Sequence, residues 1–204
     1  MSAQYYHEII TQKSFIFLQE LKREYDFVLI GGWAVFLYSK SLKSKDIDII
    51  VDYSTLAKMK EKYEVAKNER LKKYEIKTGE FDIDIYLDHY SELGVDIAKI
   101  AESAVVKDGF WVPKLEPLFL LKLFAWEKRR GSAKGQKDEL DIFSLANLAE
   151  FDWGYYRRAV EESNLQKYGQ VFVDLLKGKR EVKELSINAQ RMAKLKKQII
   201  GEIA

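Results

Sequence analysis

Two short segments in the first quarter of the chain carry the residue types that phosphate and metal chemistry require. The apolar run at residues 27–30 ends in Gly31-Gly32, and a strand that ends in glycines and opens a helix directs backbone N–H groups at an anion. Asp46 and Asp48 then alternate with isoleucines, so both carboxylates project from one face of a strand. Two carboxylates there can hold Mg²⁺ against the phosphates that the glycine turn collects.

A diglycine turn followed by an Asp-x-Asp strand resembles the signature of the nucleotidyltransferase superfamily. The resemblance implies that Gly31, Gly32 and Ser44 bind a nucleoside triphosphate, with Lys45 as a further phosphate neighbour. Taken alone, the glycines are most simply a tight packing turn, and the two carboxylates are the polar outer face of an edge strand. Their order and spacing together favour the functional interpretation.

A third carboxylate is expected from the alternating segment 81–87, which places Asp82 and Asp84 on one face. Polymerase-type transfer needs this group because one ion activates the attacking oxygen while another holds the triphosphate. A neighbouring antiparallel strand can present it. The superfamily pattern favours Asp84, and Asp82 meets the same condition. The resemblance therefore implies two Mg²⁺ ions bound by Asp46, Asp48 and Asp84, and it requires Asp84 or Asp82 to face the other two.

Lys122 is the only charged residue in the apolar segment 118–126. Burial of an ammonium group without a partner is costly, so this residue needs a counter-charge or must extend to the helix edge. Asp138 and Asp141 lie on the apolar stripe of the next helical segment. Partners for Lys122 are therefore available at the start of that segment.

The order of motifs in this half resembles the AbiEii-like branch of the superfamily, the nucleotidyltransferase toxins of type IV toxin–antitoxin and abortive-infection systems. The matching features are a Leu-x-x-Lys-Leu-x-Ala helix around Lys122, a basic loop with Arg129-Arg130, and a Lys-Asp-x-x-Asp helix start that ends at Asp141. The resemblance implies that Lys122 helps to neutralise the triphosphate. It also implies that Asp141 orients Lys122 or lies close to the acceptor.

The elements that position these residues indicate an α+β fold. A helical apolar stripe is expected over residues 2–25. Strand-type alternation or apolar runs occur at residues 27–30, 46–52, 74–77 and 81–87, and the segment 74–77 is typical of an edge strand. Beyond residue 112 the periodicity is helical. The sequence thus predicts a nucleotidyltransferase-fold mixed β-sheet with flanking helices in residues 1–112 and a C-terminal helical bundle in residues 113–204.

Composition excludes several classes of function. The 34 Lys and Arg residues nearly balance the 32 Asp and Glu residues in this 204-residue chain, so attraction to nucleic acid would have to come from local clusters of charge. The absence of cysteine excludes disulfides and thiolate metal sites, and without a signal-peptide-like start we expect a cytoplasmic protein. The longest apolar run is too short for a bilayer, and no membrane role is expected.

The expected activity is transfer of a nucleoside monophosphate from an NTP to a hydroxyl group on RNA, such as a tRNA end, or on a protein. An antitoxin protein is a further expected partner. Two alternatives stay open at this point. One is a non-catalytic module that binds a nucleotide or a partner on the same fold, and the other is an antibiotic adenylyltransferase, which shares the glycine and Asp-x-Asp elements. The sequence identifies neither the nucleobase nor the acceptor.

Overall fold

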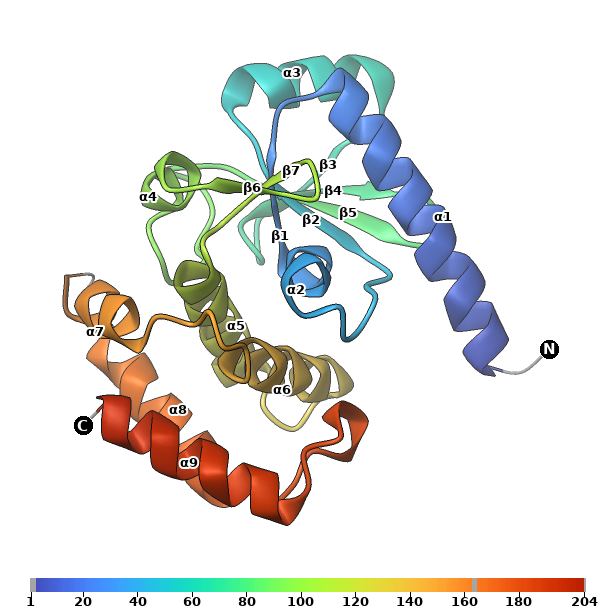
Figure 1. Ribbon diagram of the computed structural model, residues 1–204. Helices are drawn as coiled ribbons and strands as arrows, with labels where there is room; N and C mark the ends of the chain where they lie inside the picture. Colours follow the sequence, from blue (N-terminus) through green and yellow to red (C-terminus); the bar gives the residue numbers. More distant parts are fainter. Residues whose placement is uncertain (1–2, 163–164, 204) are drawn as a thin grey trace. The chain divides into compact units, whose positions relative to one another are not determined.

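The computed structural model describes residues 3–162 and 165–203 (Figure 1). The chain divides into two compact units. Unit 1 comprises Met1–Glu92 and Asp96–Lys114, and unit 2 comprises Leu93–Val95 and Leu115–Ala204. The sequence predicted a division between residues 112 and 113, and the main boundary between the units falls after Lys114.

Unit 1 contains a five-stranded sheet in the order β1-β2-β5-β4-β3. Its strands are β1 (Val28–Ile30), β2 (Ile47–Ile50), β3 (Ala66–Asn68), β4 (Lys73–Lys77) and β5 (Asp82–Tyr86). The pair β2/β5 is parallel, and the other three pairs are antiparallel. A mixed sheet with flanking helices confirms the predicted α+β class.

Two expectations about the strands were wrong. The strand that carries Asp84 lies parallel to β2, not antiparallel, because the chain leaves β2 through a helix and the β3–β4 hairpin before it returns alongside β2. The segment 74–77 is not an edge strand either. The short strand β3 pairs with its outer side, so β4 is interior and β3 is the edge.

Helices and a hairpin complete unit 1. They are α1 (Ala3–Glu24), α2 (Gly31–Ser39), α3 (Tyr53–Lys62), α4 (Ile97–Glu102) and the hairpin of β6 (Val105–Lys107) and β7 (Phe110–Val112). The rings of Phe17 on α1 and Phe81 lie 5.7 Å apart, and the Lys60 ammonium of α3 lies 4.9 Å from the Tyr74 ring centre. Helices α1 and α3 therefore cover the same face of the sheet. Residue 2, where the sequence begins the first helix, lies outside the described residues.

The two faces of the sheet differ in chemistry, as alternation along β2 and β5 predicts. Ile47, Ile49, Ile83 and Ile85 point to the face that α1 and α3 cover, and each is 0% exposed. The opposite face carries charged side chains from β2, β4 and β5, and we call it the charged face. Its members are Asp46, Asp48, Lys73, Glu75, Lys77, Asp82 and Asp84.

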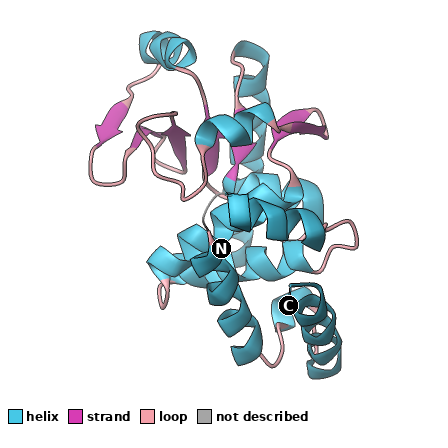
Figure 2. Ribbon diagram, turned by 90° about the vertical axis from the view of Figure 1, so that its left-hand side faces the viewer, coloured by secondary structure: helices cyan, strands magenta, loops and turns pink. Residues whose placement is uncertain are grey.

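Unit 2 is helical in its described part, and the strands of Figure 2 all belong to unit 1. Its elements are α5 (Leu115–Arg129), α6 (Ala133–Ala146), α7 (Trp153–Glu162), α8 (Gln166–Gly178), the 3₁₀ turn η1 (Lys183–Leu185) and α9 (Ala189–Ile203). Phe119 forms its aromatic centre, with edge-to-face contacts to Phe151, Trp153, Tyr156 and Phe172. None of the helices in the described part of the chain combines the length and apolar character needed to cross a bilayer.

Candidate functional site

Gly31 brings the carboxylate of Asp48 against the first turn of α2. Its φ of +67° lies in the left-handed region that favours glycine, and a Cβ at this position would lie 2.0 Å from Asp48 Oδ2. Ile30, the residue before the helix, provides no side-chain cap for the first N–H groups. Asp48 is the register partner of Ile30 across β1 and β2. The diglycine turn therefore places a carboxylate beside the backbone N–H groups of a helix start that Ile30 does not cap.

This placement has a direct electrostatic consequence. The N-terminus of a helix carries partial positive charge, which stabilises the negative charge of Asp48. The Tyr86 hydroxyl also donates to Asp48 Oδ1 at 3.4 Å. A phosphate that approached the same helix end would be repelled by the carboxylate unless a cation lay between them. The site thus favours a metal-bound phosphate over a bare anion.

Asp84 lies next to Asp48 on the charged face. The two are register partners across the parallel strands β2 and β5. Burial, and then the charge of Asp48, raise the pKa of the Asp84 carboxyl to about 6, although the Lys73 ammonium acts in the opposite direction. Asp84 Oδ1 is buried and has no hydrogen-bond partner among the described residues. The structure thus holds two carboxylates together, one of them with an unused oxygen.

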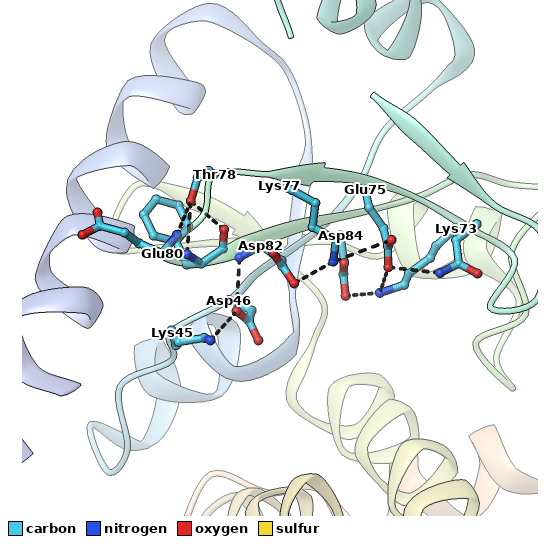
Figure 3. Close-up of polar contacts among 11 residues, drawn as sticks. Lys45, Asp46, Lys73, Glu75, Lys77, Thr78, Glu80, Asp82 and Asp84 are labelled. Atoms are coloured by element: carbon cyan, nitrogen blue, oxygen red, sulfur yellow. Dashed lines mark hydrogen bonds and ion pairs between the residues drawn. The ribbon is translucent and has the colours of Figure 1, made fainter. Parts of the chain in front are cut away.

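Asp46 and Asp82 form a second pair of a different kind, shown in Figure 3. The backbone N–H of Asp82 donates to Asp46 Oδ1 at 3.2 Å, and Lys45 Nζ lies 3.9 Å from the same oxygen. The carboxylate of Asp82 instead binds Lys77 at 2.8 Å, with its side chain 38% exposed. Of the two candidates for the third carboxylate, Asp84 is therefore the one in register with Asp48.

Two carboxylates, those of Asp48 and Asp84, are the side chains at this site that suit Mg²⁺. Within residues 3–162 and 165–203, no three or more His, Cys, Asp or Glu side chains form a group that could hold a metal ion, so Asp46 does not join Asp48 and Asp84 in one cluster. Mg²⁺ is commonly bound by one or two carboxylates together with substrate phosphates and water. The unpartnered Asp84 Oδ1, and the space that Gly31 leaves for Asp48 Oδ2, suit that kind of site.

The remaining residues expected to contact the triphosphate lie at the start of α2 and on the loop that leads into β2. Gly32 is buried in the first turn of α2. Ser44 is buried just before β2, and its hydroxyl donates to the backbone carbonyl of Asp46 at 3.0 Å. Lys45 lies on the same loop, and its side chain is 47% exposed. Ser44 therefore shapes the turn that leads into the Asp-x-Asp strand.

Lys122 and Asp141 belong to a buried ionic cluster in unit 2. Lys122 Nζ lies 2.8 Å from Asp141 Oδ2 and 3.4 Å from Asp138 Oδ1. Arg129 lies 3.0 Å from Asp138 Oδ2. Burial raises the pKa of the Asp138 carboxyl, while Lys122 and Arg129 act in the opposite direction. The structure therefore gives Lys122 the counter-charges that the sequence predicted on the next helix.

Lys73, Glu75 and Tyr86 are site neighbours that the sequence did not reveal. The first two lie in β4, and their charges suggested an exposed strand. Tyr86 lies at the end of the Asp84 strand, where it was counted only as part of the alternation. The sequence did contain one signal that β4 could be interior. Charged residues that alternate with apolar ones suit an interior strand when the neighbouring strand carries opposite charges on the same face.

Comparison with known proteins finds no matching protein-family model and no matching curated protein. Among solved structures, the chain is similar to an antigenic nucleotidyltransferase-like protein from Paracoccidioides brasiliensis, with 16% identity, coverage of 88% of this chain and 93% of that chain, and a TM-score of 0.49. A protein from H. pylori proposed to be a nucleotidyltransferase has 14% identity, 98% coverage of both chains and a TM-score of 0.47. JHP933 from Helicobacter pylori has 15% identity, coverage of 99% and 96%, and a TM-score of 0.45.

Replacement of Gly31 by alanine is expected to weaken binding of a divalent cation. The added Cβ would displace Asp48, and loss of such support costs metal affinity about 10–100-fold. The backbone strain alone costs about 1–2 kcal/mol of stability. Gly79→Ala is a matched control, because Gly79 also has positive φ but nothing lies within 4 Å of its added Cβ. Mn²⁺ titration followed by electron paramagnetic resonance checks both variants, and equal affinities would contradict the role of Gly31.

The raised pKa of Asp84 predicts a pH dependence of stability in the absence of metal. The folded chain binds this proton more tightly than the unfolded chain does, so the Asp84 contribution to stability is present at low pH. It is lost as the pH rises from the ordinary value of 3.8 to about 6. Asp84→Asn should remove this part of the dependence. Urea unfolding of both proteins across that interval, without divalent ions, measures it, and parallel curves would contradict the assignment.

Proposed function

We propose that this chain is a Mg²⁺-dependent nucleotidyltransferase that moves a nucleoside monophosphate from an NTP to a hydroxyl acceptor and releases pyrophosphate. The observation that carries the proposal is the pair Asp48 and Asp84, in register on adjacent strands, with Asp48 against the uncapped first turn of α2. A carboxylate pair beside the N–H groups of a helix start is suited to hold a metal-bound triphosphate.

Each residue has a proposed task in binding. Asp48 and Asp84 would hold Mg²⁺, and Asp46 would contribute to a second ion once the triphosphate supplies further oxygens. The backbone N–H groups of Gly31 and Gly32 would receive the phosphates. Their position at the start of α2, without a side-chain cap, supports this task. Ser44 and Lys45, on the loop that enters β2, would contact the same phosphates.

The chemistry proposed for the site is a displacement at the α-phosphorus. The acceptor oxygen forms a bond to this phosphorus, the bond to the bridging oxygen breaks, and pyrophosphate leaves with that electron pair. Asp84 would act on the acceptor hydroxyl through the cation that its Oδ1 helps to hold, and the proton of the hydroxyl would pass to solvent water. Mg²⁺, when bound, neutralises charge on the phosphates as the leaving group departs.

For unit 2 we propose the tasks expected of the toxin-like branch. Lys122 would assist in charge neutralisation, and Asp141 would orient it, a task that their 2.8 Å contact supports. The acceptor would be an RNA, such as a tRNA end, or a protein, and an antitoxin protein would be a further partner. These assignments rest on the order of the motifs along the sequence.

Transfer of radiolabel tests the activity. Each of the four α-³²P-labelled NTPs is incubated with the protein, Mg²⁺ and either total RNA or total protein of a bacterial cell. We expect label from at least one NTP in one acceptor class, with release of unlabelled pyrophosphate and dependence on Asp48. Absence of label from every combination, with protein that binds Mg²⁺ and NTP, would contradict the proposal.

A non-catalytic binding module is the second candidate, because one observation favours it. Asp84 Oδ2 is occupied by Lys73 at 2.6 Å, and the described residues form no group of three ligands. A module of this kind would bind Mg²⁺-NTP and transfer nothing. Isothermal titration calorimetry with non-hydrolysable NTP analogues, set beside the label assay, separates binding from transfer.

A further inference from the structure

Lys73 is a buried lysine on the interior strand β4, with 8% of its surface exposed. A buried ammonium is costly unless it is paired, and Lys73 has two partners. Its Nζ lies 2.6 Å from Asp84 Oδ2 and 2.8 Å from Glu75 Oε1. Burial alone would lower the pKa of Lys73, but the hydrogen bonds to the two carboxylates outweigh it and hold the pKa above the ordinary value. Lys73 is therefore a fixed positive charge at neutral pH.

The strand register builds this arrangement into the sheet. Glu75 is the register partner of Asp84 across β4 and β5, and Lys73 lies two residues before Glu75 on the same face. Asn68 of β3 donates to Glu75 Oε1 at 3.3 Å. Glu75 of β4 and Asp84 of β5 therefore hold the ammonium group directly, as Figure 3 shows, and Asn68 of β3 supports it through Glu75.

The two carboxylate oxygens of Asp84 are therefore not equally available to a ligand. Oδ2 is bound by Lys73, whereas Oδ1 is buried and has no hydrogen-bond partner among the described residues. Asp48, on β2, is the register partner of Asp84 on the side away from β4. We propose that Lys73 is a positioning residue that occupies one oxygen of Asp84 and leaves only the other for a divalent cation shared with Asp48.

The position of this charge predicts an unusual effect. The ammonium lies within a few ångströms of any cation on Asp84 and opposes its binding by Coulomb repulsion. It also fixes the direction of the carboxylate that takes part in transfer. Loss of Lys73 should therefore raise the affinity for the cation and lower the turnover. A lysine with a merely structural role would leave both unchanged or lower both.

The test compares variants that separate local contact from overall charge. Lys73→Met alone leaves Asp84 buried without its direct counter-charge and leaves Glu75 with only Lys77, at 3.7 Å. It is prone to unfold, so the main variant is Lys73→Met with Glu75→Gln. This double variant has the same net charge as the wild type. We expect it to bind Mn²⁺ about tenfold more tightly without nucleotide, since loss of the ammonium, which contacts Asp84 directly, outweighs loss of the Glu75 charge, which contacts Lys73. Its turnover at saturating Mn²⁺ should fall about tenfold.

Two single variants serve as controls. One is expected to weaken Mn²⁺ binding, and the other is expected to leave it unchanged. Glu75→Gln leaves Asp84 as the only carboxylate bound to Lys73, so Mn²⁺ affinity should fall about threefold through loss of one nearby negative charge. Lys73→Arg keeps the positive charge and its hydrogen bonds, and its Mn²⁺ affinity should stay within about twofold of the wild type. Circular dichroism and thermal melts of the full chain establish that each variant is folded.

This inference rests on the proposed function: its Mn²⁺ measurements require only that a cation binds at Asp48 and Asp84, and its turnover measurement also requires the transfer activity. If Asp48→Asn abolishes Mn²⁺ binding and the folded double variant binds no more tightly than wild type, the role of Lys73 is overturned and the cation site stands. If Asp48→Asn leaves Mn²⁺ binding unchanged, the cation site is overturned, and the inference with it. Tighter binding together with slower turnover supports the inference.

Discussion

Asp48→Asn is expected to lower nucleotidyl transfer by about a thousandfold, which corresponds to roughly 4 kcal/mol of transition-state stabilisation from a bound metal ion. Asparagine has the same shape and still fits the space beside Gly31. It lacks the charge that would hold a cation between the phosphates and the first turn of α2. Stability should stay within about 1 kcal/mol of the wild type, because the substitution removes both the repulsion that helps to raise the pKa of Asp84 and the favourable interaction of Asp48 with the start of α2. Initial rates of label transfer and a thermal melt measure the two effects.

Two further variants make this expectation specific. Asp26→Asn removes one exposed carboxylate elsewhere in unit 1 and should leave transfer within about twofold, as surface substitutions usually do. Asp84→Asn and Asp82→Asn compare the two candidates for the third carboxylate, and only the former should lower transfer strongly. A large loss with Asp82→Asn and none with Asp84→Asn would contradict the assignment made from the strand register.

Lys122→Met is expected to destabilise the protein by about 3–5 kcal/mol, the range for a buried ion pair that loses one partner. Lys122 is 7% exposed and Asp141 is 0% exposed, so little water can replace the lost ammonium. Arg129 would still compensate Asp138 at 3.0 Å, which leaves Asp141 as the uncompensated charge. Urea unfolding followed by far-ultraviolet circular dichroism measures the loss.

The control and the rescue for this prediction come from the same unit. Lys134→Met, an exposed position on α6, should change stability by no more than about 0.5 kcal/mol. The double variant Lys122→Met/Asp141→Leu should be more stable than Lys122→Met, because replacement of both partners by apolar groups leaves no buried charge at that contact. A single variant within about 1 kcal/mol of the wild type would show that the cluster contributes little to folding.

Local patterns correctly predicted the strand-to-helix turn at Gly31. An apolar run followed by Gly31 allows few structures other than a strand that turns directly into a helix, since glycine adopts the required φ of +67° without strain. The strict alternation around Asp48 determined which side chains share a face. The need of a buried ammonium for a counter-charge correctly paired Lys122 with the next helix.

Pairing between strands was not predictable from those patterns. The charges at Lys73 and Glu75 suggested exposure, because a single sequence does not tell whether a charged side chain meets water or an opposite charge on the neighbouring strand. The same limit applied to the direction of β5, which depends on the whole path of the chain between Ile50 and Asp82.

The sequence by itself determined the chemical types in the candidate site and the faces on which they lie, because period-2 alternation and glycine conformation are properties of a few consecutive residues. The tertiary structure alone decided which carboxylate stands beside Asp48, and that Lys73 binds one oxygen of that carboxylate. These contacts join strands that are distant in the sequence. Their register is fixed by the burial of the isoleucine face as a whole, and a shift of one residue would exchange that face with the charged one.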